Sequence, residues 1–282
     1  MGAQALVHRR GAGVMAGRRP ATAQRQQWAK RSLGLVGVLG FLLMWQCVSL
    51  TGVINPQFLP PASAAITALV VSLGTLEFWE AVRETMLAWG IGLGIAAVTG
   101  IVAGFVIGSS SFIRKATHST IEFLRPIPSV GLIPIAVILF GVKIESSLML
   151  IIYAAFWQIL IQVLYGVADV DMVADNTARS FGLGPVSRLR YVTFPSALPF
   201  IFTGVRLAAA IALILAITAE LIIGSPGLGH AIALAQSGGA VAEMYGLVLA
   251  AGLIGVMVNL TMRLLEKKTL SWHSSIRSEI VI

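Results

Sequence analysis

The chain has 282 residues, of which 57% are hydrophobic and 11% are charged, and its mean hydropathy is +0.87. Soluble domains carry about a quarter charged residues, so this composition excludes an ordinary soluble protein and indicates one built for lipid. Most of the excess behind the net charge of +8 lies in the amino-terminal tail and short connectors, so we expect anionic lipid headgroups of a bilayer, and no nucleic acid, as the partner.

Residues 1–31 are basic, rich in Gly, Ala, Gln and Arg, and show no sustained hydrophobic period. We expect a disordered cytoplasmic tail there. The pairs Arg9-Arg10 and Arg18-Arg19 lie far from the next apolar run, which argues against a twin-arginine export signal. The single cysteine, Cys47, excludes an intrachain disulfide and a thiol cluster for a metal.

Charge-free apolar runs predict an all-α, polytopic membrane helix bundle, because a helix needs about 20 mostly apolar residues to cross the hydrocarbon. We expect a surface helix at 62–76 after the first span, and a glycine-rich loop between Ile223 and Met244. The prolines at 126, 128 and 134 are expected to kink or break the third span. About six spans are expected, at 33–50, 85–107, 119–140, 147–166, 197–223 and 244–264.

The longest strongly polar interruption is the loop 169–195, between the fourth and fifth spans. Its first half has apolar residues at helical spacing, with acidic residues near the start and an arginine near the end, which suits the helix macrodipole. Gly182 predicts a turn through left-handed backbone, and Pro185 is placed to open a second short helix. Pro195 and Pro199 are expected to end that helix before the next span.

This loop resembles the cytoplasmic loop of ABC importer permeases, whose pattern is Glu-Ala-Ala, three residues, Gly, nine residues, then Ile-x-Leu-Pro. Ala178, Gly182 and Pro195 match in spacing, whereas Asn176 and Thr177 replace the Glu and the first Ala. The words ARSFG, FPSALPFIFTGVRLA, TAELI and SPGLGHAI are similar to the branch of permeases that imports aliphatic sulfonates, taurine and nitrate. The similarity runs from about residue 58 to residue 272.

The resemblance implies a type I ABC importer permease fold, with two copies of this chain, an ATP-binding P-loop subunit and an extracytoplasmic solute-binding protein. It implies a small anionic solute, with a thiamine-precursor pyrimidine or another small organic solute as the alternative. No phosphate loop occurs in the chain, the nearest candidate being 224–230, so we expect no enzyme activity and no cofactor, with ATP bound by the partner. The residues implied to couple to the ATPase are Asn176, Thr177, Ala178, Arg179, Gly182 and Pro195.

Four polar residues within the spans are candidates for the translocation path or its gate, each with a structural alternative. Gln158 and Gln162 lie four apart on one stripe of a helix and could line the path or join helices by hydrogen bonds. Arg206 could attract an anionic solute or anchor the span at the membrane surface. Glu220 could act at an outer gate or in hydrogen-bonded packing. A further pair, Glu122 with Arg125, is expected to form an ion pair within its helix.

Lys and Arg counts in the connectors predict the orientation, because cytoplasmic loops are enriched in both. Only Arg83 and Lys143 would lie outside if the amino terminus is inside. We therefore expect a bacterial inner-membrane protein with a membrane domain at 32–266, both termini cytoplasmic, and a second tail at 267–282.

A secondary transporter or channel that needs no ATPase is the rival hypothesis. It requires membrane carboxylates for an ion relay, and only Glu220 and Glu122 are candidates. A membrane enzyme is weaker still, because no cluster of catalytic side chains occurs.

Overall fold

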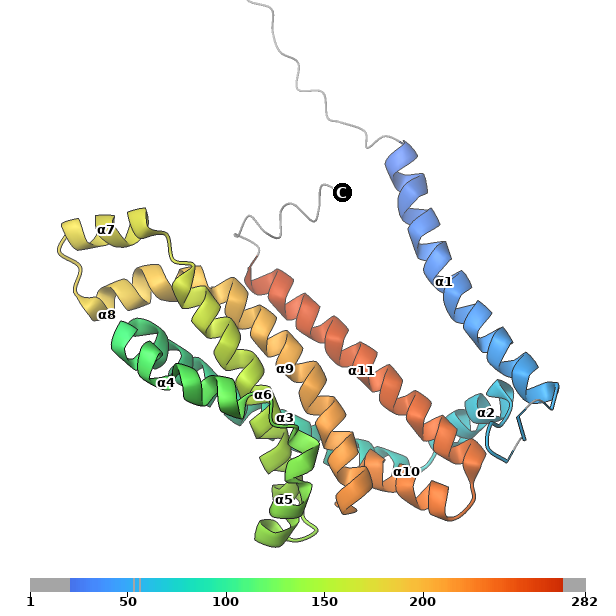
Figure 1. The fold of residues 1–282 in the computed structure, drawn as a ribbon. Coiled ribbons are helices and arrows are strands. Elements are labelled where there is room, and N and C mark those ends of the chain that lie inside the picture. Colours follow the sequence, from blue (N-terminus) through green and yellow to red (C-terminus); the bar gives the residue numbers. More distant parts are fainter. Residues whose placement is uncertain (1–20, 53, 56, 271–282) are drawn as a thin grey trace, which may run out of the picture.

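The computed structural model describes residues 21–52, 54–55 and 57–270, in which every regular element is a helix (Figure 1). This confirms the predicted all-α membrane bundle. The long helices are α1 (Ala21–Leu50), α3 (Leu76–Ser109), α6 (Ile144–Ala168), α9 (Phe194–Ile223) and α11 (Val241–Thr269). The shorter elements are α2 (Ala62–Ser72), α4 (Ser111–Leu124), the 3₁₀ turn η1 (Ser129–Leu132), α5 (Ile133–Phe140), α7 (Met172–Ser180), α8 (Pro185–Arg188), the π-helical turn η2 (Leu189–Thr193) and α10 (Leu228–Ser237).

Several boundaries differ from those expected. The expected tails at 1–31 and 267–282 fall mostly outside the described residues, but α1 already begins at Ala21 and α11 continues to Thr269. The expected glycine-rich loop before the last span contains the helix α10, because Leu228, Ile232 and Ala235 recur at helical spacing and are buried.

Four helices in the described part of the chain are long and apolar enough to cross a membrane, namely α3, the run Pro185–Ile223, α6 and α11. The pair α4 and Ser129–Phe140 forms a fifth span if its bend of 82° is counted within one span. The first expected span lies in α1, whose apolar part Val36–Leu50 is shorter. The prediction of about six spans therefore corresponds to four straight spans, one broken span and α1.

Helix α6 lies at the centre of the bundle, packed along α3 on one side and α9 on the other. Glycines of α3 allow this approach: a Cβ at Gly104 would lie 2.5 Å from Val163 Cγ1, and one at Gly92 would lie 2.5 Å from Ile151 Cγ2. On α9, buried alanines play the same part, as small residues do between membrane helices.

The broken span bends where the three prolines were expected to disturb it. Residues 125–128 separate α4 from η1, and Pro134 lies in the first turn of α5, where its missing N–H has no partner to lose. At the break, the hydroxyl of Tyr153 on α6 donates a hydrogen bond of 2.6 Å to the carbonyl of Leu124. The same carbonyl accepts a bond of 3.2 Å from the N–H of Ile127, so a neighbouring helix adds a second bond near the point where the helix stops.

The expectation that Pro195 and Pro199 end the loop helix is wrong. Helices α8, η2 and α9 form one run, Pro185–Ile223, of 39 residues. Pro195 lies in the first turn of α9, and the π-helical turn before it changes the hydrogen-bond pattern that a proline would otherwise interrupt. Pro199 lies inside α9, where its own carbonyl accepts a bond of 2.9 Å from Thr203 Oγ1.

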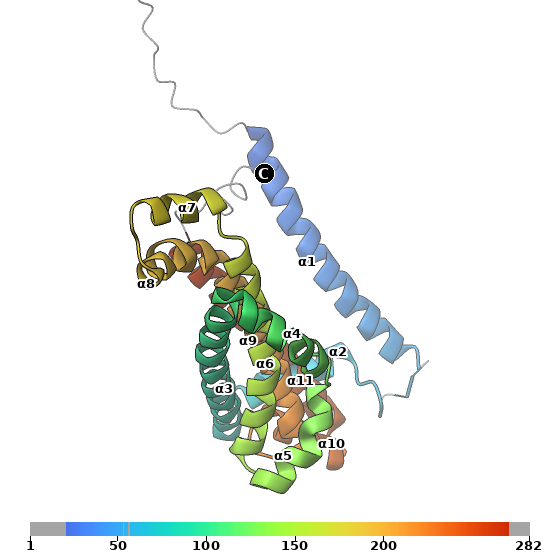
Figure 2. The same cartoon turned by 60° about the vertical axis from the view of Figure 1, so that its left-hand side comes forward.

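The bundle has two ends that differ in content, and both views show them (Figures 1 and 2). One end carries α7 and α8 and is called the α7 end. The opposite end carries α2 and α10 and is called the α10 end. Helix α1 diverges from the bundle and is tied to it near the α10 end, where Trp45 Nε1 donates to the carbonyl of Pro60 at 3.0 Å.

Candidate functional site

The loop 169–195 folds as a helical hairpin of α7 and α8 that stands out from the bundle at the α7 end (Figure 1). Helix α7 begins at Asp171, whose Oδ1 accepts a hydrogen bond of 2.7 Å from the N–H of Val173. This carboxylate caps the positive end of the helix dipole, and Arg179 lies in the last turn at the negative end. The acidic residue at the start of the helix and the arginine at its end therefore lie as the sequence predicted.

A glycine turn ends α7 as expected. Gly182 has φ of +75°, the N–H of Leu183 donates to the carbonyl of Ala178 at 3.0 Å, and the N–H of Gly182 donates to that of Arg179 at 2.9 Å. This pair of bonds is the Schellman motif, which needs a left-handed residue. A Cβ at Gly182 would meet nothing within 4 Å, so the requirement for glycine is conformational rather than steric.

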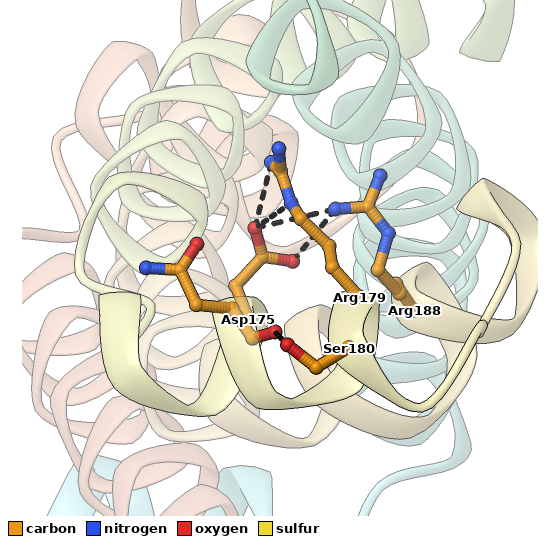
Figure 3. A network of polar contacts seen from close by, with 5 residues as sticks. Asp175, Arg179, Ser180 and Arg188 are labelled. Carbon is orange, nitrogen blue, oxygen red and sulfur yellow. Dashed lines mark hydrogen bonds and ion pairs between the residues drawn. The ribbon is translucent and has the colours of Figure 1, made fainter.

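An ionic network joins the two helices of the hairpin (Figure 3). Arg188 of α8 donates through Nη1 to both carboxylate oxygens of Asp175 on α7, at 3.0 and 3.2 Å. Arg179 contacts the same carboxylate, with Nη2 at 2.8 Å and Nε at 3.0 Å from Oδ2. Asp175 and Arg188 are each about a quarter exposed, whereas Arg179 is mostly exposed. The cross-helix contact is therefore the better shielded of the two.

The hairpin presents apolar side chains to solvent. Met172, Val173, Phe181 and Val186 are between 72% and 80% exposed, and Ala178 is the one buried residue of α7. Exposed apolar clusters of this kind mark contact surfaces for a partner. Asn176 and Thr177 are also exposed, on the same short helix. Of the six coupling residues expected from the sequence, five thus lie on the hairpin, while Pro195 lies in the first turn of α9.

Two of the candidate path residues contact a neighbouring span. Nη1 of Arg206 on α9 lies 3.0 Å from Oε2 of Glu266 on α11, so this arginine joins two spans near the α7 end. Gln162 packs against α9, since a Cβ at Gly204 would lie 2.9 Å from its own Cβ. Gln158 lies one turn earlier on α6, and its side chain makes no hydrogen bond within the part of the chain that the structure describes. A role of these residues in the path stays a prediction.

The fourth candidate, Glu220, fixes the loop before α10. It is 1% exposed, and its Oε2 accepts bonds from Thr85 Oγ1 at 2.8 Å and from the N–H of Gly229 at 3.0 Å. Thr85 in turn accepts a bond of 2.9 Å from the N–H of Leu228. A Cβ at Gly227 would lie 2.2 Å from the carboxyl carbon of Glu220. The second glycine of the Gly-Leu-Gly sequence thus donates to the carboxylate, and the first lies directly against it.

The expected ion pair between Glu122 and Arg125 is wrong. Oε2 of Glu122 lies 3.4 Å from Nδ1 of His118, one turn earlier on α4. Arg125 is the residue that follows α4, at the start of the break, and has no carboxylate within ion-pair distance among the described residues.

Comparison with known proteins agrees with this architecture. Residues 96–268 match the model of the binding-protein-dependent transport system inner membrane component. The chain belongs to this family. The permease is an ABC importer subunit rather than an enzyme, and ATP hydrolysis lies in a separate ATPase.

Curated relatives cover most of the permease. It is 29% identical over 251 residues to the taurine transport system permease protein TauC of Escherichia coli (strain K12), covering 87% of this chain and 90% of the relative. It is 30% identical over 258 residues to the bicarbonate transport system permease protein CmpB of Synechocystis sp., covering 85% and 90% of the two chains.

Solved structures show the same fold. An inward-facing form of the MetNI methionine ABC transporter aligns with a TM-score of 0.61 and 15% identity, over 68% of this chain and 95% of that one. An amino acid ABC transporter aligns with a TM-score of 0.56 and 18% identity, over 68% and 92% of the two chains.

Sequence reasoning missed the partners that hold these residues in place. The sequence gives no sign that Asp175 of α7 and Arg188 of α8 form one ion pair. Their separation by a turn and a second helix hides the pairing from any local period. The sequence did not indicate that Thr85 binds Glu220 or that Glu266 binds Arg206, because the two residues of each pair are far apart in the chain.

Proposed function

We propose that two copies of this chain form the membrane pathway of an ATP-driven importer for a small anionic solute, with the α7–α8 hairpin seated on the ATPase. The observation that carries the proposal is the continuity of the hairpin with a span. The exposed apolar surface of α7 is bound through Asp175 and Arg188 to a helix that runs unbroken from Pro185 to Ile223. Movement of α7 would therefore move α9 as one body.

The solute class is supported by the relatives. The names of these relatives mention taurine, bicarbonate, aliphatic sulfonates and nitrate, which are small solutes that carry oxyanion groups. The external solute-binding protein would select among them, and ATP would bind only to the partner ATPase. No cofactor is assigned to this chain.

The orientation follows from the charges. Arg179, Arg188 and Arg190 lie at the α7 end, while Arg83 and Lys143 lie toward the α10 end. With the α7 end in the cytoplasm of a bacterium, both termini are cytoplasmic and the α10 end faces the binding protein. The exposed apolar side chains along the spans then face lipid or the second copy.

Site-directed cross-linking tests the docking. In a Cys47→Ala background, a Val173→Cys thiol on α7 should cross-link to the co-expressed ATPase, and uptake of labelled taurine, sulfonate and nitrate identifies the solute. A Leu234→Cys thiol on α10 is the matched control, because Leu234 is also exposed but lies at the opposite end. Cross-linking of the ATPase to position 234 and not to position 173 would reverse the proposed orientation.

A further inference from the structure

The break in the broken span leaves polar backbone groups without partners. Between α4 and η1 the chain runs through Arg125, Pro126, Ile127 and Pro128, and the two prolines have no N–H to donate. The carbonyls of Arg125, Pro126 and Ile127 accept no hydrogen bond from the backbone of the residues that the structure describes. Arg125, Pro126 and Pro128 are exposed. The single chain therefore does not cover this irregular segment.

The break lies at membrane depth. Next to it, η1 and α5 pack against α6 (Figure 2), and the carbonyl of Leu124 accepts its bond from Tyr153 of α6. Helix α6 runs from Ile144 to Ala168, so at 1.5 Å per residue Tyr153 is about 14 Å from one end and about 22 Å from the other. The hydrocarbon core is about 30 Å thick. The break is thus inside the core and not at its surface.

Lipid cannot cover such a segment. Irregular backbone at this depth occurs only where protein covers it or where it lines a water-filled cavity, because hydrocarbon offers no hydrogen-bond partner. The side chains favour water. On α4, which leads to the break, Arg114, His118 and Glu122 are exposed, and so is Arg125 at the break itself. Charged side chains within a membrane protein face water or one another rather than lipid.

The polar surface has a definite extent. Helix α4 begins near the α7 end, because Gly108, just before it, packs against Val167 close to the end of α6. Beyond the break, α5 exposes Ile135, Ile138 and Leu139, which are between 48% and 83% exposed and suit lipid or a second copy of the chain. The exposed polar surface therefore runs from the α7 end along α4 and stops at the break.

We propose that α4 and the break line a water-filled path that enters the membrane from the α7 end, and that Arg125 at its inner limit makes this path favour anions. Arg125 has no carboxylate within ion-pair distance in the described part of the chain, whereas Glu122 lies 3.4 Å from His118. A second copy of the chain would form the opposite wall. The role of Arg125 rests on the proposed function for its anionic solute, but the presence of water at the break does not.

Thiol reactivity tests for water at the break. The full-length chain, with Cys47→Ala, is studied in nanodiscs excised from native membranes, which keep bound partners and open both faces to solution. N-ethylmaleimide crosses lipid but reacts with the thiolate, which forms in water and not in apolar surroundings. A Val130→Cys thiol in η1 should react about tenfold faster than an Ile95→Cys thiol on α3.

Ile95 is the matched control for Val130. Both are β-branched apolar residues, and they are 43% and 44% exposed. Gly92 of α3 packs against Ile151 of α6, and the two helices run in the same direction, so Ile95 is nearly level with Tyr153. Its depth therefore equals that of the break, but it belongs to a regular apolar helix. Equal rates at the two positions would overturn the water-filled path.

The charge preference is measured on the same Val130→Cys protein. The anionic methanethiosulfonate reagent should react about fourfold faster than the cationic one, relative to their rates with a free thiol, as expected for one positive charge about 10 Å away in water. High salt should remove the preference. Arg125→Gln should also remove it. Lys115→Gln should not, because this exposed cation lies ten residues earlier on α4, about 15 Å away along the helix.

The outcomes separate the parts of the proposal. A fast reaction at position 130 with equal rates for the two charged reagents, or an anion preference that survives Arg125→Gln, would overturn the role of Arg125. None of these measurements uses ATP, the solute or the binding protein. A chain that shows the water and the anion preference but imports none of the tested solutes would count against the proposed function, and not against the path.

Discussion

The two ends of the bundle each use a carboxylate to join helices, but in opposite surroundings. At the α7 end, Asp175 meets two arginines in a hairpin whose apolar side chains are exposed. At the α10 end, Glu220 is almost fully buried and accepts bonds from a hydroxyl and a backbone N–H. Water screens the first contact and not the second. The α7 end is thus open to a partner and tolerant of change, whereas the α10 end depends on close fit.

The largest effect is expected from Gly229→Ala. An added Cβ would lie 2.1 Å from the carbonyl oxygen of Ile217 and 2.7 Å from Cβ of Glu220, and backbone atoms cannot yield as a flexible side chain can. Overpacking of this kind costs about 3 kcal/mol or more. We expect a much lower Tm of the purified permease and lower membrane abundance. Gly252→Ala is the control, because nothing lies within 4 Å of a Cβ there. Equal stability of the two variants would show that the α10 end is not tightly fitted.

Removal of the buried carboxylate should have the next largest effect. Glu220→Ala leaves Thr85 and the N–H of Gly229 without an acceptor, at about 1 to 3 kcal/mol for each unsatisfied group. Glu220→Gln keeps one acceptor oxygen, so its Tm should fall less. Thermal unfolding of both variants in detergent measures the difference. A Glu220→Gln protein as unstable as Glu220→Ala would mean that the negative charge, and not the hydrogen bonding, holds the loop.

A smaller and purely functional effect is expected from Gly182→Val. The left-handed turn costs a β-branched residue about 1 to 3 kcal/mol, while no neighbouring atom is displaced. Uptake and stimulated ATP hydrolysis should fall while abundance in the membrane stays near that of the unaltered chain. Gly182→Asn, which tolerates left-handed backbone better, should keep more of both activities. Unchanged uptake by Gly182→Val would remove the turn from the coupling path.

The smallest effect is expected from the partly exposed contact between Asp175 and Arg188. Arg188→Ala should destabilise the hairpin by about 1 kcal/mol, because solvent screens this pair, and should lower the ATP-coupled uptake modestly. Arg179→Ala removes the more exposed contact to the same carboxylate and is expected to change uptake less. Exchange of the charges in Asp175→Arg with Arg188→Asp should restore part of the uptake. No recovery in the exchanged protein would contradict a bracing role.

Most of the fold was readable from hydrophobic runs, because lipid requires long apolar helices and leaves few alternatives. The turn at Gly182 was predicted correctly for a different reason, because a glycine that follows a short helix commonly ends it in the left-handed conformation. The prediction that Pro195 and Pro199 end the loop helix was wrong. A π-helical turn precedes α9, and Pro195 lies in its first turn, where a proline does not interrupt the helix. The site contacts depend on residues distant in sequence, such as Thr85 with Glu220, and no local pattern encodes them.

The broken span has a consequence for how the protein is made. Neither α4, with 14 residues, nor α5, with 8, is long enough to cross the hydrocarbon by itself. The carbonyl of Leu124 at the break accepts one hydrogen bond from the N–H of Ile127 and a second from Tyr153, which the ribosome synthesises later. During insertion this carbonyl has only the first of these bonds until α6 arrives. The broken span and α6 are therefore expected to leave the translocon together, as one helical unit.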